Sequence, residues 1–145
     1  MGRPYHNNNR YKTYYIPYNT QTILPEATII NVHALFLTKG IHHVTVPTTY
    51  DGRMLIKNFM DSLHYYQHIG YLTLDQYPQE IFDTTTYKDM YAILQKDGYD
   101  ALMIELFECD FFVIEYTDSL EQQSWFDTFI HEMNHSTTPV ILISA

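Results

Sequence analysis

Short apolar runs alternate along the chain with longer segments whose apolar residues recur every three or four positions. The runs at residues 111–114 and 140–143 are apolar at every position, which is typical of strands buried on both faces. Helical periodicity predicts a helix over about 53–68 and a second one with the stripe Phe126, Phe129, Ile130 and Met133. Strands that alternate with helices favour a mostly parallel sheet with helices on both faces, which is the three-layer α/β class.

Weaker patterns complete the predicted order of elements. We expect further strands at about 42–46 and 71–75. A capping-box-like Thr86-x-x-Asp89 predicts a helix that begins near Thr86 and ends at Gly98. A short helix is expected over 101–107, and Asp118 or Ser119 is expected to cap the helix that follows residues 111–116. Residues 27–37 favour a helix.

Composition places the chain among ordinary globular domains. It has 145 residues, of which 46% are hydrophobic and 17% charged, so we expect one domain with one core. No apolar run approaches the roughly 18 residues that span a bilayer, so membrane insertion is not expected. No apolar stretch near the start resembles a signal peptide, and Cys109 is the only cysteine. A cytoplasmic protein is the simplest interpretation.

Charge divides the chain into two unlike parts. The net charge is −9, but residues 1–60 carry six Lys/Arg against two acids, whereas residues 75–132 carry fourteen acids against two lysines. The acidic part would repel nucleic acid, so no nucleic-acid partner is expected. We interpret residues 1–25 as a basic, tyrosine-rich arm and residues 26–145 as a single α/β domain.

The arm has the composition of an interface. Tyrosine and arginine are enriched where proteins meet, and we expect the arm to contact an acidic surface on a second copy or on another protein. The alternative is an arm without fixed structure. The residues expected to bind a partner are Tyr5, Arg10, Tyr11, Lys12, Tyr14, Tyr15 and Tyr18.

The stretch between the strand at 42–46 and the following helix has the frame of a phosphate-binding loop. A working loop reads G-x-x-x-x-G-K-[ST], in which glycines expose backbone N–H groups, lysine neutralises phosphate and the hydroxyl holds magnesium. Here these positions read Pro47-Thr-Thr-Tyr-Asp-Gly52-Arg53-Met54. Proline has no N–H to donate, and the thioether of Met54 is a poor ligand for magnesium. The loop is therefore degenerate.

The order of these segments resembles the core of RecA/KaiC-type P-loop ATPases. The resemblance covers about residues 27–145 and lies in the run Gly40–Pro47 with Gly52-Arg53, in 71–75, in Asp110–Glu115 with Asp118-Ser119, and in 139–144. It implies a RecA-like P-loop NTPase topology, with Glu115 at the position of the Walker B acid. Only Gly52 and the acidic character of Glu115 match the residues that active members use.

The degraded motifs imply a pseudo-ATPase. The chain is similar in architecture to bacterial SOS cell-division inhibitors and to the N-terminal domain of the cellulose-secretion regulator BcsE, which keep the fold without the loop and bind other proteins. By this analogy we expect a regulatory scaffold that is not an enzyme and needs no cofactor, with a protein partner or a homo-oligomer as its working form. An alternative is a residual nucleotide-binding protein that uses Arg53.

A second motif favours a different class. His131-Glu132-Met133-Asn134-His135 matches H-E-x-x-H, the helix motif of zinc metallopeptidases. Against this alternative, both histidines are expected on the helix face opposite the apolar stripe, and the ten residues after His135 offer no third ligand. We therefore predict no metal site and keep His131, His135 and Glu132 as candidates.

Two acids are expected near one another at the carboxyl edge of the sheet. Asp75 and Glu115 both end predicted strands and are candidates for an acid/base pair or a cation site. The alternative is that they are the remnant of a lost magnesium site.

Overall fold

The computed structural model describes residues 12–15, 40–61 and 68–145, and for 12–15 it describes the backbone only. In these described parts of the chain, six strands form one sheet in the order β1-β2-β6-β5-β3-β4, and every neighbouring pair is parallel. The strands are β1 Lys12–Tyr15, β2 Gly40–Thr45, β3 Ile69–Leu72, β4 Tyr87–Asp89, β5 Phe111–Glu115 and β6 Pro139–Ser144. The helices are α2 Thr49–Asp61, α3 Met90–Asp97, α4 Tyr99–Glu108, α5 Asp118–Glu121 and α6 Phe126–Asn134.

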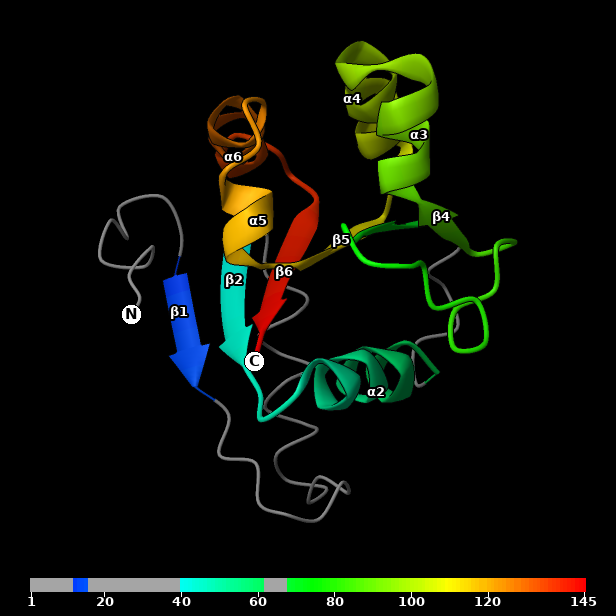
Figure 1. Ribbon diagram of the computed structural model, residues 1–145, viewed down its shortest axis with the longest axis vertical. Helices are drawn as coiled ribbons and strands as arrows, with labels where there is room; N and C mark the ends of the chain where they lie inside the picture. The colour runs from blue at the N-terminus through cyan, green and yellow to red at the C-terminus, as the bar shows by residue number, and fades with distance from the viewer. Residues whose placement is uncertain (1–11, 16–39, 62–67) are drawn as a thin grey trace.

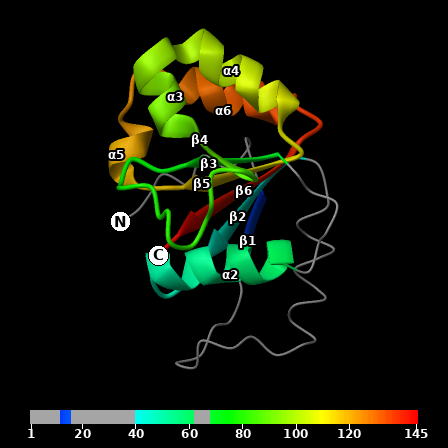
Figure 2. The same ribbon diagram turned by 90° about the vertical axis from the view of Figure 1, so that its right-hand side faces the viewer.

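Helices cover both faces of this sheet (Figure 1). Of the described helices, Figure 2 shows α2 beneath the strands and α3, α4 and α6 above them. The parallel sheet and the three layers predicted from the sequence are therefore confirmed at this level. None of the described helices combines the length and apolar character needed to cross a bilayer.

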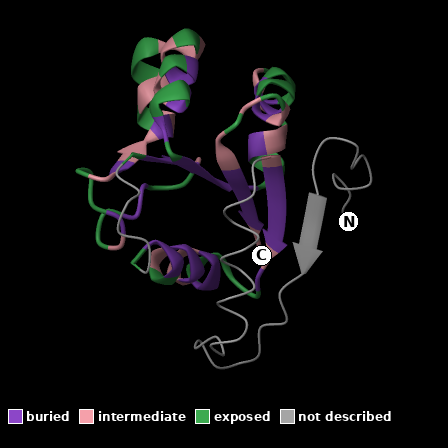
Figure 3. Cartoon of the chain, turned by 180° about the vertical axis from the view of Figure 1, so that it is seen from behind, coloured by how far each residue is buried: buried purple, intermediate pink, exposed green. Residues whose placement is uncertain are grey.

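The sheet separates two hydrophobic cores, because successive side chains of a strand point to opposite faces. In β5, Phe111 and Val113 belong to the core beneath the sheet, whereas Phe112 and Ile114 belong to the core above it. Strand β6 alternates in the same way. All four of these β5 side chains are fully buried (Figure 3), as the uninterrupted apolar run predicted.

Helix α2 begins earlier than the periodicity predicted, at Thr49, because Thr48 caps it. The Thr48 hydroxyl accepts a hydrogen bond from the backbone N–H of Asp51 at 3.0 Å and donates one to the Asp51 carboxylate at 2.8 Å. The Thr48 hydroxyl thus satisfies one backbone N–H of the first turn, as N-cap side chains do, and holds the Asp51 carboxylate beside it. The predicted apolar stripe packs beneath the sheet through Leu55, Ile56, Phe59 and Met60.

The segment before α3 differs from its prediction. Thr86 does not cap a helix, because residues 87–89 form β4 at the edge of the sheet. The cap is Asp89, whose carboxylate accepts from the backbone N–H of Ala92 at 3.1 Å. Similarly, α5 is capped by Thr117 and not by Asp118 or Ser119. The helix expected at residues 27–37 lies outside the described residues.

Residues 12–15 also differ from expectation. The sequence placed them in an arm separate from the domain, but they form β1, which pairs in parallel with β2 in the register Lys12↔His42 to Tyr15↔Thr45. The strand was concealed because Lys12-Thr13-Tyr14-Tyr15 contains no apolar run, and β1 is an edge strand of the sheet as far as the structure describes it. The boundary at residue 25 therefore does not separate an arm from the sheet.

Gly70 in β3 lies directly against the ring of Phe112. A Cβ at this position would lie 2.7 Å from Cδ2 and 2.8 Å from Cε2 of the Phe112 ring, and Phe112 is fully buried. Gly70→Ala should therefore lower the free energy of unfolding by about 1–3 kcal/mol. Urea denaturation measures this change. Phe112→Leu should relieve part of the clash, so the double variant should be more stable than the two single losses added together; additive losses would contradict this origin.

Candidate functional site

The site is organised around Glu115, the last residue of β5. Because side chains alternate between the two faces of a strand, its carboxylate lies on the same side as Phe111 and Val113, toward α2. Glu115 is only 5% exposed. A carboxylate in this position is costly unless nearby groups neutralise it and donate hydrogen bonds to it.

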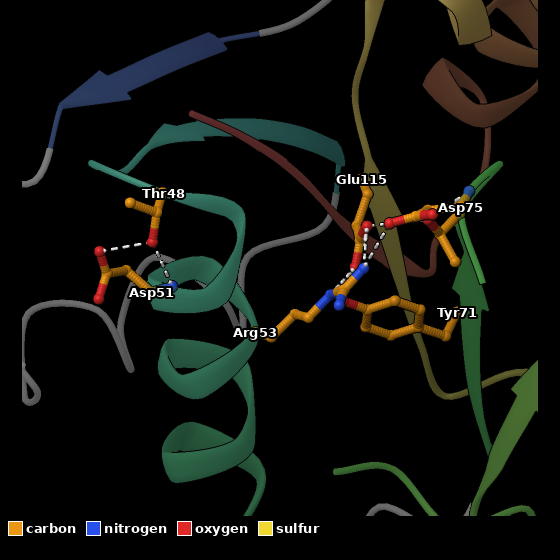
Figure 4. Close-up of polar contacts among 7 residues, drawn as sticks. Thr48, Asp51, Arg53, Tyr71, Asp75 and Glu115 are labelled. Carbon is orange, nitrogen blue, oxygen red and sulfur yellow. Dashed lines mark hydrogen bonds and ion pairs between the residues drawn. The ribbon is translucent and has the colours of Figure 1, made fainter. Parts of the chain in front are cut away.

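Arg53 supplies the neutralising charge. Its Nε donates to Oε2 of Glu115 at 2.7 Å and its Nη2 donates to Oε1 at 3.0 Å, which is the two-pronged geometry that makes arginine–carboxylate pairs strong. Figure 4 shows Arg53 reaching from α2 across to the end of β5. Hydrogen bonding to Glu115 raises the pKa of the Arg53 guanidinium further above its ordinary value.

Gly52 lets the helix come close enough for this contact. A Cβ on Gly52 would lie 3.0 Å from Ile143 Cδ1 and 3.2 Å from Val46 Cγ2. The start of α2 therefore packs directly on β6, and the next residue, Arg53, projects over the neighbouring strand β5. The glycine that matched the phosphate-loop pattern serves here in packing.

Two hydroxyl groups of the β3 segment complete the surroundings of the carboxylate. Tyr71 donates to Oε2 of Glu115 at 2.5 Å and Thr73 donates to Oε1 at 2.8 Å. Burial raises the pKa of Tyr71, and the negative charge of Glu115 raises it further, so the phenol stays protonated as a donor. With the two bonds from Arg53, each carboxylate oxygen accepts two hydrogen bonds, which uses its lone pairs.

Asp75 lies at the solvent side of the same cluster. Its side chain is 78% exposed and its Oδ2 is 3.6 Å from Nη2 of Arg53. The structure thus brings Asp75 and Glu115 to one place, as expected, and Arg53 binds to both. The cation between the two acids is the guanidinium of the protein itself. At this exposure the outer ion pair contributes little to stability.

Magnesium-bound nucleotide does not fit the residues present. Its metal would need a free oxygen on Glu115, but both oxygens are committed to donors. Met54, at the position of the hydroxyl ligand, is partly buried, and Pro47 is exposed and has no N–H. The Asp51 carboxylate already lies in the first turn of α2, where a phosphate would otherwise meet the helix dipole.

A shallow hollow lies at the carboxyl ends of β2, β5 and β6. It offers only about 20 Å³ of space to a water-sized molecule and is lined by Val46, Thr49, Glu115, Tyr116, Thr117, Ile143, Ser144 and Ala145. Ligands of parallel α/β sheets bind at this edge, but pockets for small molecules usually enclose roughly 300–1,000 Å³. The position is typical of a ligand site, and the size is below the usual range.

The candidate metal residues lie elsewhere, on α6. His131, Glu132 and His135 are exposed, while Phe126, Phe129, Ile130 and Met133 are buried, so the predicted orientation of this helix is confirmed. The two imidazole rings lie 4.9 Å apart between centroids. Among the described residues, no group of three His, Cys, Asp or Glu side chains is arranged to hold a metal ion.

Only three of the residues expected to bind a partner lie in the described part of the chain. Lys12, Tyr14 and Tyr15 belong to β1, at the edge of the sheet opposite β4. The other members of that set, Tyr5, Arg10, Tyr11 and Tyr18, lie outside the described residues.

Tyr71 and Thr73 are site residues that the sequence analysis missed. They stand at positions i and i+2 relative to one another, and Asp75 at i+4, so strand periodicity alone places all three on one face. Polar side chains that recur at this period at the end of an apolar strand could have identified them.

No protein family, curated protein or solved structure matches this chain.

His43 is buried on the upper side of β2, beside Ser144, which lines the hollow. Its Nε2 and the Ser144 hydroxyl are hydrogen-bonded at 2.7 Å, and its ring lies 6.3 Å from that of Tyr116. Burial lowers the pKa of His43 from 6.5 to about 4. The folded protein therefore holds this imidazole neutral at pH values where an unfolded chain would protonate it.

This difference predicts acid sensitivity. As the pH falls below 6.5 the unfolded chain gains a proton at His43 that the folded chain does not accept until about pH 4, so stability falls across this window. Between pH 7.5 and pH 5 the contribution of His43 should be about 2 kcal/mol. Urea unfolding at both pH values should show a smaller decline for His43→Gln than for the wild type. Equal declines would contradict this assignment.

Breaking the central ion pair should be far more costly than breaking a surface pair on the same helix. Arg53→Ala leaves Glu115 buried without its counter-charge and should lower the free energy of unfolding by about 3 kcal/mol. Lys57, which pairs with Asp61 at 3.2 Å on the surface of α2, is the matched control. Lys57→Ala should change stability by less than about 0.5 kcal/mol in the same urea titration. Stability losses of similar size in the two variants would contradict the expectation that the buried pair at Glu115 stabilises the fold more than the surface pair.

Proposed function

We propose that this chain is a RecA-like pseudo-ATPase domain that neither binds nor hydrolyses nucleotide and acts as a protein-interaction or regulatory module in a larger assembly. The observation that carries the proposal is the pairing of Arg53, from the degenerate loop, with Glu115, at the Walker-B-like position. In this interpretation the protein supplies an internal cation where an active enzyme binds magnesium.

Energetics supports the inactive state. Nucleotide that engaged Glu115 through a metal would first have to break its bonds to Arg53. A cost of about 3 kcal/mol for separating that pair corresponds to a loss of more than a hundredfold in affinity. The missing N–H at Pro47 and the missing hydroxyl at Met54 would weaken binding further.

The finer topology belongs to the same proposal. The degenerate loop joins β2 to α2, the acid ends β5, and β6 lies between these two strands in the sheet. Loop and acid thus meet at one edge of a parallel sheet, which is where the phosphate and metal of a P-loop ATPase would be bound. This agreement of order, spacing and position supports a RecA-like relationship.

Binding of other proteins is the role that remains for such a domain. The hollow at the carboxyl edge is small, and exposed positions of α3 to α6 carry six acids, which are Asp97, Asp100, Glu108, Asp118, Asp127 and Glu132. A surface of one sign of charge favours encounters with a partner of the opposite sign. The zinc peptidase alternative has no comparable support, because His131 and His135 lie on an exposed helix face away from the hollow.

Calorimetric titration of the full chain with Mg-ATP tests the proposal. We expect no binding with a dissociation constant below about 100 µM, and no phosphate release above the buffer blank, because Arg53 occupies Glu115. Arg53→Ala serves as the control for heat that does not come from the loop. Magnesium-dependent binding that the control abolishes would overturn the proposal in favour of a residual nucleotide-binding protein.

A further inference from the structure

The outer face of α4 exposes two large apolar side chains. Ile104 is 62% exposed and Phe107 is 70% exposed, one helical turn apart. The opposite face of the helix packs onto the sheet through Leu102, Met103 and Leu106. The α4 face is therefore formed by Ile104 and Phe107, and Figure 3 shows that exposed positions are concentrated on the outer turns of the α3–α4 pair.

Acids surround the α4 face. Asp100 and Glu108 are exposed on the same side of the helix, Glu105 is half-buried beside them, and α4 contains no lysine or arginine. Lys96, near the end of α3, is the nearest basic residue along the chain. Two copies that met through this face would place like charges against each other, so a symmetrical α4–α4 contact is disfavoured. The face requires an occupant that is both basic and aromatic or apolar.

The chain contains one segment of that chemistry. Residues 1–11 include Arg3 and Arg10 together with Tyr5 and Tyr11, and they contain no acid. Because residues 12–15 form β1, the part that precedes the sheet is residues 1–11. Tyrosine rings suit an exposed Phe–Ile pair, and the arginines suit its acidic rim.

Geometry favours a second copy over the same chain as the source of this segment. Strands β1 and β4 are opposite edges of the sheet, five strand spacings apart, or about 24 Å. Figure 1 shows α4 on the far side of the molecule from β1. Arg10 lies two residues before β1, so the backbone can carry it at most about 7 Å from that strand, and it cannot reach the acids around α4 of its own copy.

We propose that the α4 face binds residues 1–11 of a second copy of this chain. The inference rests on the proposed function as an interaction module and names the partner. Because one copy offers the segment and the other offers the face, the contact either continues head-to-tail or closes as a symmetrical dimer in which each copy gives its segment to the other.

Sedimentation velocity of the full chain tests this proposal. Over about 10–200 µM protein, the wild type should self-associate in about 50 mM salt and dissociate in about 0.5 M salt, because charge pairs contribute to the contact. Ile104→Ser with Phe107→Ser, and separately Arg3→Glu with Arg10→Glu, should each weaken association at least about tenfold. Tyr50→Ser is the matched control, since Tyr50 is 58% exposed on α2, and it should associate like the wild type.

Mixing the two double variants identifies the occupant. One variant retains an intact face and the other an intact segment, so the mixture should regain association while each variant alone does not. A wild type that is monomeric throughout, an equal loss in Tyr50→Ser, or a mixture that stays monomeric would overturn the proposal. Binding of Mg-ATP to a chain that still associates in this way would overturn the proposed function and leave this inference standing.

Discussion

A negative charge buried at the end of a strand is the constraint on which this structure depends. Glu115 has almost no access to water, so the protein must surround it with donors. Arg53, Tyr71 and Thr73 provide them from α2 and from the β3 segment, two parts of the chain that are not neighbours of β5 in sequence. The carboxylate therefore fixes the position of the helix beneath the sheet relative to two adjacent strands.

The same cluster connects the fold to the proposed function. The carboxyl edge of a parallel sheet is where ligands usually bind, because loops that leave the strands diverge there. In this chain the edge is closed by internal contacts: Arg53 binds Glu115, and Asp51 lies in the first turn of α2. Protein surfaces away from this edge, such as the α4 face, are then the available places for recognition.

Sequence patterns were sufficient for the large elements of the fold. Continuous apolar runs predicted β5 and β6, and a clear stripe predicted the buried face of α6, because burial on both faces or along one helix face leaves an unambiguous periodicity. The edge strands β1 and β4 were missed. Among the described strands each has one paired neighbour, so packing does not require an apolar run there, and local cues at Thr86 favoured a helix start instead.

The candidate site was predicted in part for similar reasons. Loop and acid could be recognised because Gly52, Arg53 and Glu115 keep the spacing of a known motif. That Arg53 binds Glu115 depends on the order of strands and on the close packing of Gly52 against β6, which are tertiary facts. The sequence placed Tyr71 in a predicted strand. That its hydroxyl donates a hydrogen bond depends on the neighbouring strand β5, which carries the acceptor Glu115.

The pairing of Arg53 with Glu115 also restricts how this sequence can change over generations. A substitution at either position alone leaves the other charge buried without its partner. This costs about 3 kcal/mol, against a total stability of roughly 5–15 kcal/mol for a domain of this kind. Lineages that carry such a single change would lose much of their folded protein before a second change could compensate. The two positions are therefore expected to change together.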